Sequence, residues 1–172
     1  MTEFVNPSEI LNKLKLRKDM VAADFGCGSG GWVLPLANTV NEGKIYAIDV
    51  LEEKLSALKS KARMQKLPNI ETILDDAETK IEALSGESCD LVLMTNLLYL
   101  CEDKKAVLAE GKRVLKTGGR ILVVDWVKDN PMTKEIEYVS FDEIKTAAKE
   151  LGLQIEKEFS AGSYHLALIM IK

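Results

Sequence analysis

Residues 20–31 read Met-Val-Ala-Ala-Asp-Phe-Gly-Cys-Gly-Ser-Gly-Gly, an apolar run and an acid followed by four glycines within six positions. The run over 20–25 predicts a buried strand. Glycine lets the loop after it bend sharply and lets a ligand approach its backbone, because glycine has no Cβ atom. A helix predicted over 32–40 then directs its free N–H groups to the same place. The stretch therefore predicts a binding site for an adenosine-bearing cofactor.

The glycines of this loop fit two patterns. Gly26, Gly28 and Gly31 match the dinucleotide fingerprint G-x-G-x-x-G, which alone is a weak signal. Asp24, Gly26, Gly28 and Gly30 match acid-x-G-x-G-x-G. A dinucleotide loop admits a pyrophosphate, which the Asp24 carboxylate would repel, so we favour the second pattern. In the second pattern, Gly31 belongs to the first turn of a helix packed close to the strand. The alternative for Asp24 is a purely structural role, in which its side chain caps the loop backbone.

Composition limits the function classes. The chain has 172 residues, is 47% hydrophobic and 29% charged, and carries a net charge of −4, which is typical of one globular domain over 1–172. No basic cluster indicates a nucleic-acid surface, and no apolar run approaches membrane-spanning length. The three cysteines have no metal-like spacing, so we expect reduced thiols, no metal site and a cytoplasmic protein, either monomer or homodimer.

Strand and helix patterns alternate along the chain. Apolar runs predict strands over 20–25, 44–49, 70–74, 91–94 and 121–124. Helical spacings predict helices after Asn6, over 51–62, over 104–115 with Gly118 and Gly119 as its end, and over 141–151. This alternation is typical of a parallel sheet covered on both faces.

The last twenty residues change pattern. Leu153, Ile155 and Phe159 alternate with polar residues, which predicts an edge strand, and residues 164–171 are apolar on both faces. We therefore expect the last strand to be antiparallel and to lie inside the sheet, next to the edge strand that precedes it in sequence. A dinucleotide-binding domain has no need of such a terminal hairpin.

From about Val21 to Lys172, the acid-and-glycine loop and the terminal hairpin resemble the class I S-adenosylmethionine-dependent methyltransferases, in particular their small-molecule and quinone-methyltransferase branch. The resemblance implies an α/β, Rossmann-like open sheet of seven strands, mostly parallel, in the order 3-2-1-4-5-7-6, with helices on both faces. It implies S-adenosylmethionine as cofactor, S-adenosylhomocysteine as product, no metal, and methyl transfer to a small-molecule acceptor by in-line displacement.

The resemblance also implies roles for single residues. Asp49, about 20 residues after the loop, would accept the ribose hydroxyls. Asp76 would contact the adenine amino group, with Asp75 as a competitor and a turn-forming role as the alternative. Asp24, directly or through water, would hold the α-ammonium group. The expected cofactor-binding residues are Asp24, Gly26, Cys27, Gly28, Gly30, Asp49, Val50, Asp76, Ala77, Asn96 and Leu97.

Three residues are candidates for catalysis. His165, the one histidine of the chain, would lie at the carboxyl edge of the sheet and accept a proton, although a structural role is the alternative. Asn96 is a substrate contact or a helix cap. Tyr99, together with Trp126 and Tyr164, lines the pocket or packs in the core.

Two segments are long enough to act as lids, the N-terminal helix region 1–15 and residues 127–140. The apolar side chains Phe4, Ile10, Leu11 and Leu14 cover the cofactor or dock on the sheet, and both alternatives stay open.

Other functions remain open. The stretch from Asn96 to Tyr99 lacks the Asn/Asp-Pro-Pro-Tyr motif of many nucleic-acid amino-methylases, and the basic residues around Lys61 form only a modest surface. An RNA or protein methyltransferase is one alternative, a non-catalytic S-adenosylmethionine-binding protein is another, and an NAD-dependent oxidoreductase with the other glycine pattern is a third.

Overall fold

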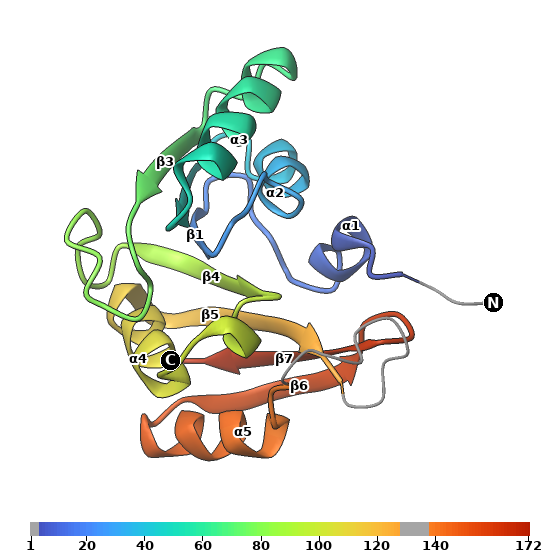
Figure 1. Cartoon of the computed structure of the whole chain (residues 1–172), viewed down its shortest axis with the longest axis vertical. Helices are drawn as coiled ribbons and strands as arrows, with labels where there is room; N and C mark the ends of the chain where they lie inside the picture. Colours follow the sequence, from blue (N-terminus) through green and yellow to red (C-terminus); the bar gives the residue numbers. More distant parts are fainter. Residues whose placement is uncertain (1–3, 128–137) are drawn as a thin grey trace.

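The computed structural model of the chain describes residues 4–127 and 138–172. Its strands form one sheet in the order β3-β2-β1-β4-β5-β7-β6. Strands β1 to β5 pair in parallel, and β7 pairs antiparallel with both β5 and β6. The predicted order and the inserted antiparallel last strand are confirmed, with β6 at one edge (Figure 1).

The elements follow the predicted alternation. The strands are β1 Val21–Phe25, β2 Lys44–Asp49, β3 Ile70–Leu74, β4 Cys89–Thr95, β5 Leu115–Trp126, β6 Gln154–Ser160 and β7 His165–Ile171. The helices are α1 Pro7–Leu11, α2 Val33–Thr39, α3 Glu52–Met64, α4 Lys104–Val114 and α5 Phe141–Glu150, with a 3-10 turn, η1, at Leu98–Leu100.

Successive residues of the central strands supply two cores, one on each face. In β4, Leu91 and Leu93 pack with α1, α2 and α3, whereas Val92 and Met94 pack with α4 and α5. This alternation arises because neighbouring side chains of a strand point to opposite faces. The uninterrupted apolar runs of the sequence therefore correspond to strands that are buried on both sides, as expected.

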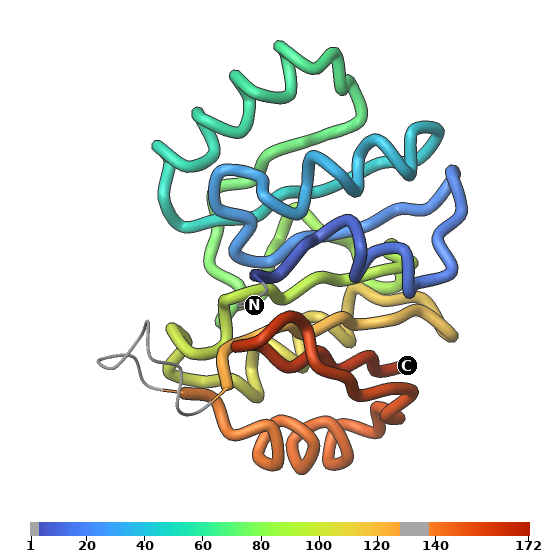
Figure 2. Tube along the Cα trace, turned by 90° about the vertical axis from the view of Figure 1, so that its right-hand side faces the viewer, coloured from blue at the N-terminus to red at the C-terminus, as the bar shows by residue number. Residues whose placement is uncertain are grey.

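The N-terminal helix docks on the sheet. Ile10, Leu11 and Leu14 are buried in the core that α2 and α3 cover, and α1 lies beside α2 in Figures 1 and 2. Asn6 caps the helix, because its side-chain oxygen accepts the N–H of Ser8 at 3.1 Å. Ile10, Leu11 and Leu14 therefore dock on the sheet, whereas Phe4 is 65% exposed and does not. The second candidate lid, 127–140, lies almost wholly outside the described residues.

The end of α4 differs from the prediction. The helix stops at Val114, and Gly118 and Gly119 lie within β5 rather than terminating the helix. Gly118 has a φ of +78° and donates its N–H to the Lys172 carbonyl, and Lys172 donates its own N–H to the Gly119 carbonyl. These backbone bonds to the last residue of the chain draw the glycine turn into the strand, a long-range effect that local sequence does not contain.

Candidate functional site

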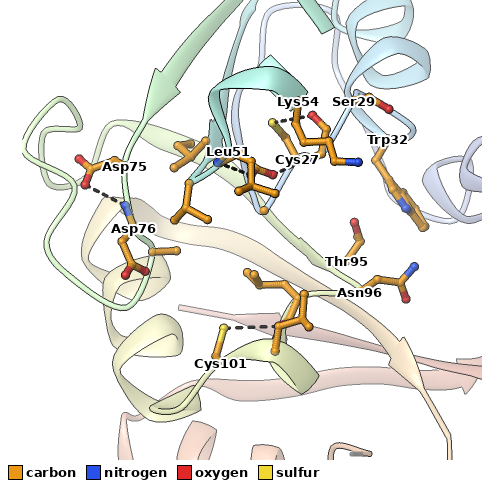
Figure 3. Close-up of a pocket in the computed structure, with 18 of the residues that line it drawn as sticks. Cys27, Ser29, Trp32, Leu51, Lys54, Asp75, Asp76, Thr95, Asn96 and Cys101 are labelled. Carbon is orange, nitrogen blue, oxygen red and sulfur yellow. Dashed lines mark hydrogen bonds between the residues drawn. The ribbon is translucent and has the colours of Figure 1, made fainter. Parts of the chain in front are cut away.

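A cavity of about 520 Å³ opens at the carboxyl ends of β1, β2, β3 and β4 (Figure 3). In open α/β sheets this edge is where ligands bind, between helices that leave the sheet on opposite faces. The cavity is lined by Gly26, Cys27, Gly28, Ser29, Gly31, Trp32, Ile48, Asp49, Val50, Leu51, Lys54, Asp75, Asp76, Ala77, Glu78, Thr95, Asn96, Leu97, Leu100 and Cys101. Most of the residues expected to bind a cofactor are thus brought together.

In the glycine loop, Gly26, Gly28 and Gly31 line the cavity, whereas Gly30 packs against α3. Gly26, Gly28 and Gly30 have φ values of +71°, +52° and +93°, which L side chains rarely adopt. A Cβ atom on Gly28 would meet nothing within 4 Å, whereas one on Gly30 would lie 2.4 Å from Cδ1 of Leu58. Gly30 is buried against α3 and is not among the lining residues, whereas Gly31 is. Gly31 was expected in the first turn of the following helix, but it lies just before that helix, because Trp32 is the N-cap of α2. The glycine that packs against α3 is Gly30.

Asp24 lies in β1 just before the loop and is completely buried. Neither of its carboxyl oxygens has a hydrogen-bond partner within residues 4–127 and 138–172. Burial, and secondarily the nearby Asp49 carboxylate, raise the pKa of Asp24 well above its usual value. An unpartnered buried carboxyl group is costly. Asp24 lies outside the cavity lining, unlike most of the other residues expected to bind the cofactor.

Asp49, at the end of β2, connects the loop to the neighbouring strand. Its Oδ2 accepts the N–H of Gly28 at 2.8 Å and its Oδ1 accepts the N–H of Leu51 at 2.9 Å. The next two side chains are apolar yet exposed, Val50 by 60% and Leu51 by 45%. A carboxylate flanked by exposed apolar side chains forms an amphipathic wall of the cavity.

Asp75 and Asp76 follow β3 and lie at one end of the cavity (Figure 3). Asp75 Oδ1 accepts the N–H of Asp76, and Asp76 Oδ1 accepts the N–H of Glu78, each at 2.9 Å. The turn-forming role named as the alternative for Asp76 is therefore present. Each carboxylate keeps a second oxygen outside these bonds, so both acids can still bind a ligand.

The end of β4 supplies the opposite end of the cavity. Asn96 lines it together with Thr95 and Leu97, and has a φ of +50°. Its Oδ1 lies 2.9 Å from Nε2 of His165, the first residue of β7. Two of the predicted catalytic candidates are thus in contact across 69 positions of sequence. His165 itself is 7% exposed and is not among the lining residues, and burial lowers its pKa to about 4.

The aromatic candidates are placed outside the cavity lining. Trp126 lies against the His165 ring with ring centroids 3.9 Å apart. Tyr99 lies in η1, where its N–H donates to Asp125 at 3.3 Å. Tyr99 also packs against the core that α4 and α5 cover. Neither Tyr99 nor Trp126 nor Tyr164 is among the lining residues, so the lining role expected for them is not seen.

The cavity contains two thiols with suppressed reactivity. Burial raises the pKa of Cys27 far above its usual value and raises that of Cys101 to about 12. Both therefore remain protonated near neutral pH, which agrees with Cys27 as a small filler between glycines.

Sequence reasoning missed several lining residues. Ser29, Trp32, Leu51, Lys54, Thr95, Leu100 and Cys101 also line the cavity. Lys54 is the single Lys or Arg among the described lining residues, and its signal was its place in the first turn of the helix that follows Asp49. Trp32 was read as the start of a helix, which it is, as the N-cap of α2.

Residues 4–127 and 138–172 contain neither a metal-binding cluster nor a membrane-spanning helix. They contain no group of three His, Cys, Asp or Glu side chains arranged to hold a metal ion. None of the helices they form is long and apolar enough to cross a membrane.

The chain is similar to proteins of known family. A family model described as "Methyltransferase domain" matches residues 16–161. A demethylmenaquinone methyltransferase of Geobacillus stearothermophilus is 30% identical over 112 residues, which are 64% of this chain and 47% of that protein. An uncharacterized protein from a transposon of Streptomyces fradiae is 33% identical over 69% of this chain and 34% of its own length. The chain spans half or less of the length of these curated relatives.

Solved structures agree in fold. A S-adenosylmethionine-dependent methyltransferase from Aquifex aeolicus superposes with a TM-score of 0.89 at 26% identity, covering 98% of this chain and 91% of its own. The magnesium protoporphyrin IX methyltransferase of Synechocystis, solved with S-adenosylmethionine bound, has a TM-score of 0.76 at 17% identity over 96% of this chain and 76% of its own. The second likeness shows the fold alone. With a family match over most of its length and this strand order, the chain belongs to the methyltransferase domain family, as a class I S-adenosylmethionine-dependent methyltransferase.

Proposed function

We propose that the cavity binds S-adenosylmethionine and that the chain transfers its methyl group to a small-molecule acceptor. The observation that carries this proposal is the buried, unpartnered Asp24 carboxyl group beneath a glycine loop. S-adenosylmethionine carries an α-ammonium group that this carboxyl group would hold through a water molecule, because Asp24 itself is completely buried and lies outside the lining. A dinucleotide offers no cation there, and its pyrophosphate would be repelled.

The charges of the lining support the same cofactor. The described lining residues include one basic side chain, Lys54, and four acidic ones, Asp49, Asp75, Asp76 and Glu78. S-adenosylmethionine bears a sulfonium, an ammonium and one carboxylate, so its net charge is positive and complements this acidic cavity. The residues present therefore fit this cofactor better than one with phosphates.

Each predicted binding residue has a proposed role. Asp49 would accept the ribose hydroxyls with the lone pairs left free by its two backbone bonds. Val50 and Ala77 would contact the adenine faces, and Asp76 or Asp75 the adenine amino group. The methionine part would lie along the remaining predicted residues, Gly26, Cys27, Gly28, Asn96 and Leu97, all of which line the cavity. Gly30 would act only by shaping the loop.

When bound, the cofactor supplies a methyl group already activated by a positively charged sulfur. The task of the chain is to align the acceptor with that group and to keep water away. Trp32, Leu97 and Leu100 give the cavity apolar surface for this purpose. No protein nucleophile is required, and the protonated state of Cys27 and Cys101 is consistent with that.

Calorimetry with S-adenosylmethionine, S-adenosylhomocysteine and NAD tests the cofactor. We expect the first two to bind and NAD not to bind. Asp49→Ala should weaken S-adenosylmethionine binding at least tenfold, since it removes both the ribose contact and the bond that holds Gly28. Glu53→Ala removes a charge from the same part of the chain but outside the lining, and should leave affinity unchanged. Tight NAD binding without S-adenosylmethionine binding would overturn the proposal.

The acceptor is proposed from the relatives. Proteins named demethylmenaquinone methyltransferase match up to 34% identity, which supports a quinol-like small molecule. Transfer of a radiolabelled methyl group onto quinols, phenols, amines and RNA tests this. Label on RNA would favour the RNA methyltransferase alternative, and label on none of them, with the cofactor bound, a non-catalytic binding protein. Three free, buried cysteines support a reducing location such as the cytoplasm.

A further inference from the structure

Asn96 is held by the backbone in an unusual conformation. Its φ of +50° lies in the left-handed region, which disfavours residues other than glycine. Its N–H donates to the Val124 carbonyl at 2.8 Å, which anchors the end of β4 to β5. Asparagine tolerates this region better than most other residues, and the backbone bond to Val124 fixes the position of Asn96 at the cavity edge.

The side chain of Asn96 is held as well. Its Oδ1 lies 2.9 Å from Nε2 of His165, which comes from the far strand β7. The His165 ring lies against Trp126, its partner in the β5–β7 ladder, with ring centroids 3.9 Å apart and planes inclined by 38°. An imidazole that is 7% exposed and packed on an indole has little freedom to turn.

The proton on His165 decides which part of the amide faces the cavity. With its pKa lowered by burial to about 4, the imidazole is neutral at pH 7 and carries one N–H. If Nε2 carries it, Nε2 donates to Oδ1 of Asn96, and both amide N–H bonds remain available to a ligand. The side chain has this orientation in Figure 3, where the amide nitrogen of Asn96 points toward Trp32 and the oxygen points away.

We propose that His165 is a positioning residue that donates to Asn96, so that the Asn96 amide NH₂ group donates hydrogen bonds to an oxygen of the methyl acceptor. The proposal rests on the proposed function and names its substrate class: an acceptor with a phenolic, quinol or enol oxygen. An amine acceptor must keep its lone pair for the methyl group and has N–H bonds to donate, so it would prefer a carbonyl oxygen to an NH₂ group.

This role differs from proton abstraction by His165. Its Nε2 faces Asn96, and the ring is outside the cavity lining, so the imidazole acts through Asn96 rather than on the acceptor. Asn96 itself lies at the opposite end of the cavity from Asp75 and Asp76 (Figure 3). That separation leaves the Trp32 and Asn96 end for the acceptor when the adenosine part occupies the acidic end.

Because His165 is the one histidine in the chain, selective ¹⁵N-histidine labelling gives a single set of imidazole signals. We expect the Nε2–H tautomer and a titration midpoint below about 5, in line with the lowered pKa. The Nδ1–H tautomer would overturn the proposal, because Asn96 would then donate to Nε2 and turn its carbonyl oxygen to the cavity. This measurement uses the free wild-type protein and is independent of cofactor binding.

Two variants test the function of the pair. His165→Phe removes the donor, and His165→Gln restores an N–H that can reach Asn96. With 1,4-dihydroxynaphthalene as the oxygen probe, His165→Phe should lower kcat/KM for radiolabelled methyl transfer at least tenfold, and His165→Gln should remain within about threefold of wild type. Both variants should still bind S-adenosylmethionine in calorimetry, which shows that they fold, and the loss of affinity in His165→Phe should be smaller than its loss of kcat/KM.

The results that would overturn the positioning role of His165 differ from those that would refute the proposed function. Unchanged transfer in His165→Phe, or label entering 1-naphthylmethylamine but not 1,4-dihydroxynaphthalene, overturns the positioning role and the oxygen-acceptor class. Label on neither probe while the cofactor binds counts against the acceptor class as well. Loss of S-adenosylmethionine binding by the wild-type protein would instead refute the proposed function, and the imidazole tautomer would still decide the arrangement of the pair.

Discussion

The different roles of neighbouring glycines can be tested with Gly30→Ala. The new Cβ would lie 2.4 Å from Cδ1 of Leu58 and 3.3 Å from Cγ of Leu34. Leu58 is completely buried, so its side chain cannot swing into solvent to make room. The backbone of Gly30, with a φ of +93°, is also unfavourable for alanine.

The magnitude follows from these two effects. A left-handed conformation costs an L residue about 1–2 kcal/mol. Overpacking a well-filled site costs about 1–3 kcal/mol. We therefore expect Gly30→Ala to lower the free energy of unfolding by about 2–5 kcal/mol. Because Gly30 does not line the cavity, S-adenosylmethionine affinity should change much less than stability at temperatures where the variant is folded.

Equilibrium unfolding in urea, followed by the fluorescence of the two tryptophans, measures this loss. Two control variants replace other glycines of the same loop. Gly28→Ala has a positive φ but open space, so it should cost only about 1–2 kcal/mol while narrowing the cavity. Gly31→Ala has neither strain nor a contact within 4 Å, so its stability should stay within about 0.5 kcal/mol of wild type. A loss below about 1 kcal/mol for Gly30→Ala, or an equal loss for Gly31→Ala, would refute the reasoning.

Three further predictions concern buried polar groups. The pKa of Asp24 is higher in the folded protein than in the unfolded chain, where it is 3.8. The protonated carboxyl group therefore contributes its full share to the free energy of unfolding below pH 3.8, and this share is lost as pH rises through the folded pKa. Asp24→Asn should therefore abolish this part of the pH dependence in thermal unfolding, raise cofactor-free stability above the folded pKa, and weaken S-adenosylmethionine binding. Glu110→Ala should cost about 2–4 kcal/mol in urea unfolding, because Glu110 accepts the Ile81 N–H at 2.9 Å and pairs with the partly exposed Arg113. Glu110→Gln, which can still accept the Ile81 N–H, should cost less. The thiols of Cys27 and Cys101 should react with a disulfide reagent at pH 8 only after denaturation, and rapid labelling of the native protein would contradict their raised pKa values.

Patterns within short segments of the sequence predicted much of the fold. The apolar run of β4 was assigned correctly because burial on two faces imposes a residue pattern that is local. β6 is the edge strand that was predicted, although most of its residues are exposed, Ile155 by 42%. The order of the strands came from the resemblance together with the terminal hairpin, and the sheet confirms it. The boundary of α4 was missed because backbone bonds from Lys172 draw Gly118 and Gly119 into β5.

The candidate site was predictable where its residues follow strand ends. Asp49, Asp76 and Asn96 each stand just after or at the end of a parallel strand, and such ends meet at one edge of the sheet. Lys54 and Trp32 were missed because a helical residue reaches a cavity only through the orientation of its helix, which packing determines.

The sequence by itself predicted a strand, a glycine loop and a set of strand-end acids that together suit a cofactor site, since each of these is a local property of the chain. Only the tertiary structure decided which glycine supports the loop, because α3 places Leu58 over Gly30 and leaves Gly31 facing the cavity. Tertiary structure alone also joined Asn96 to His165 across 69 positions. Contacts of this kind depend on which strands become neighbours and on how helices lie over them, and no local pattern encodes that.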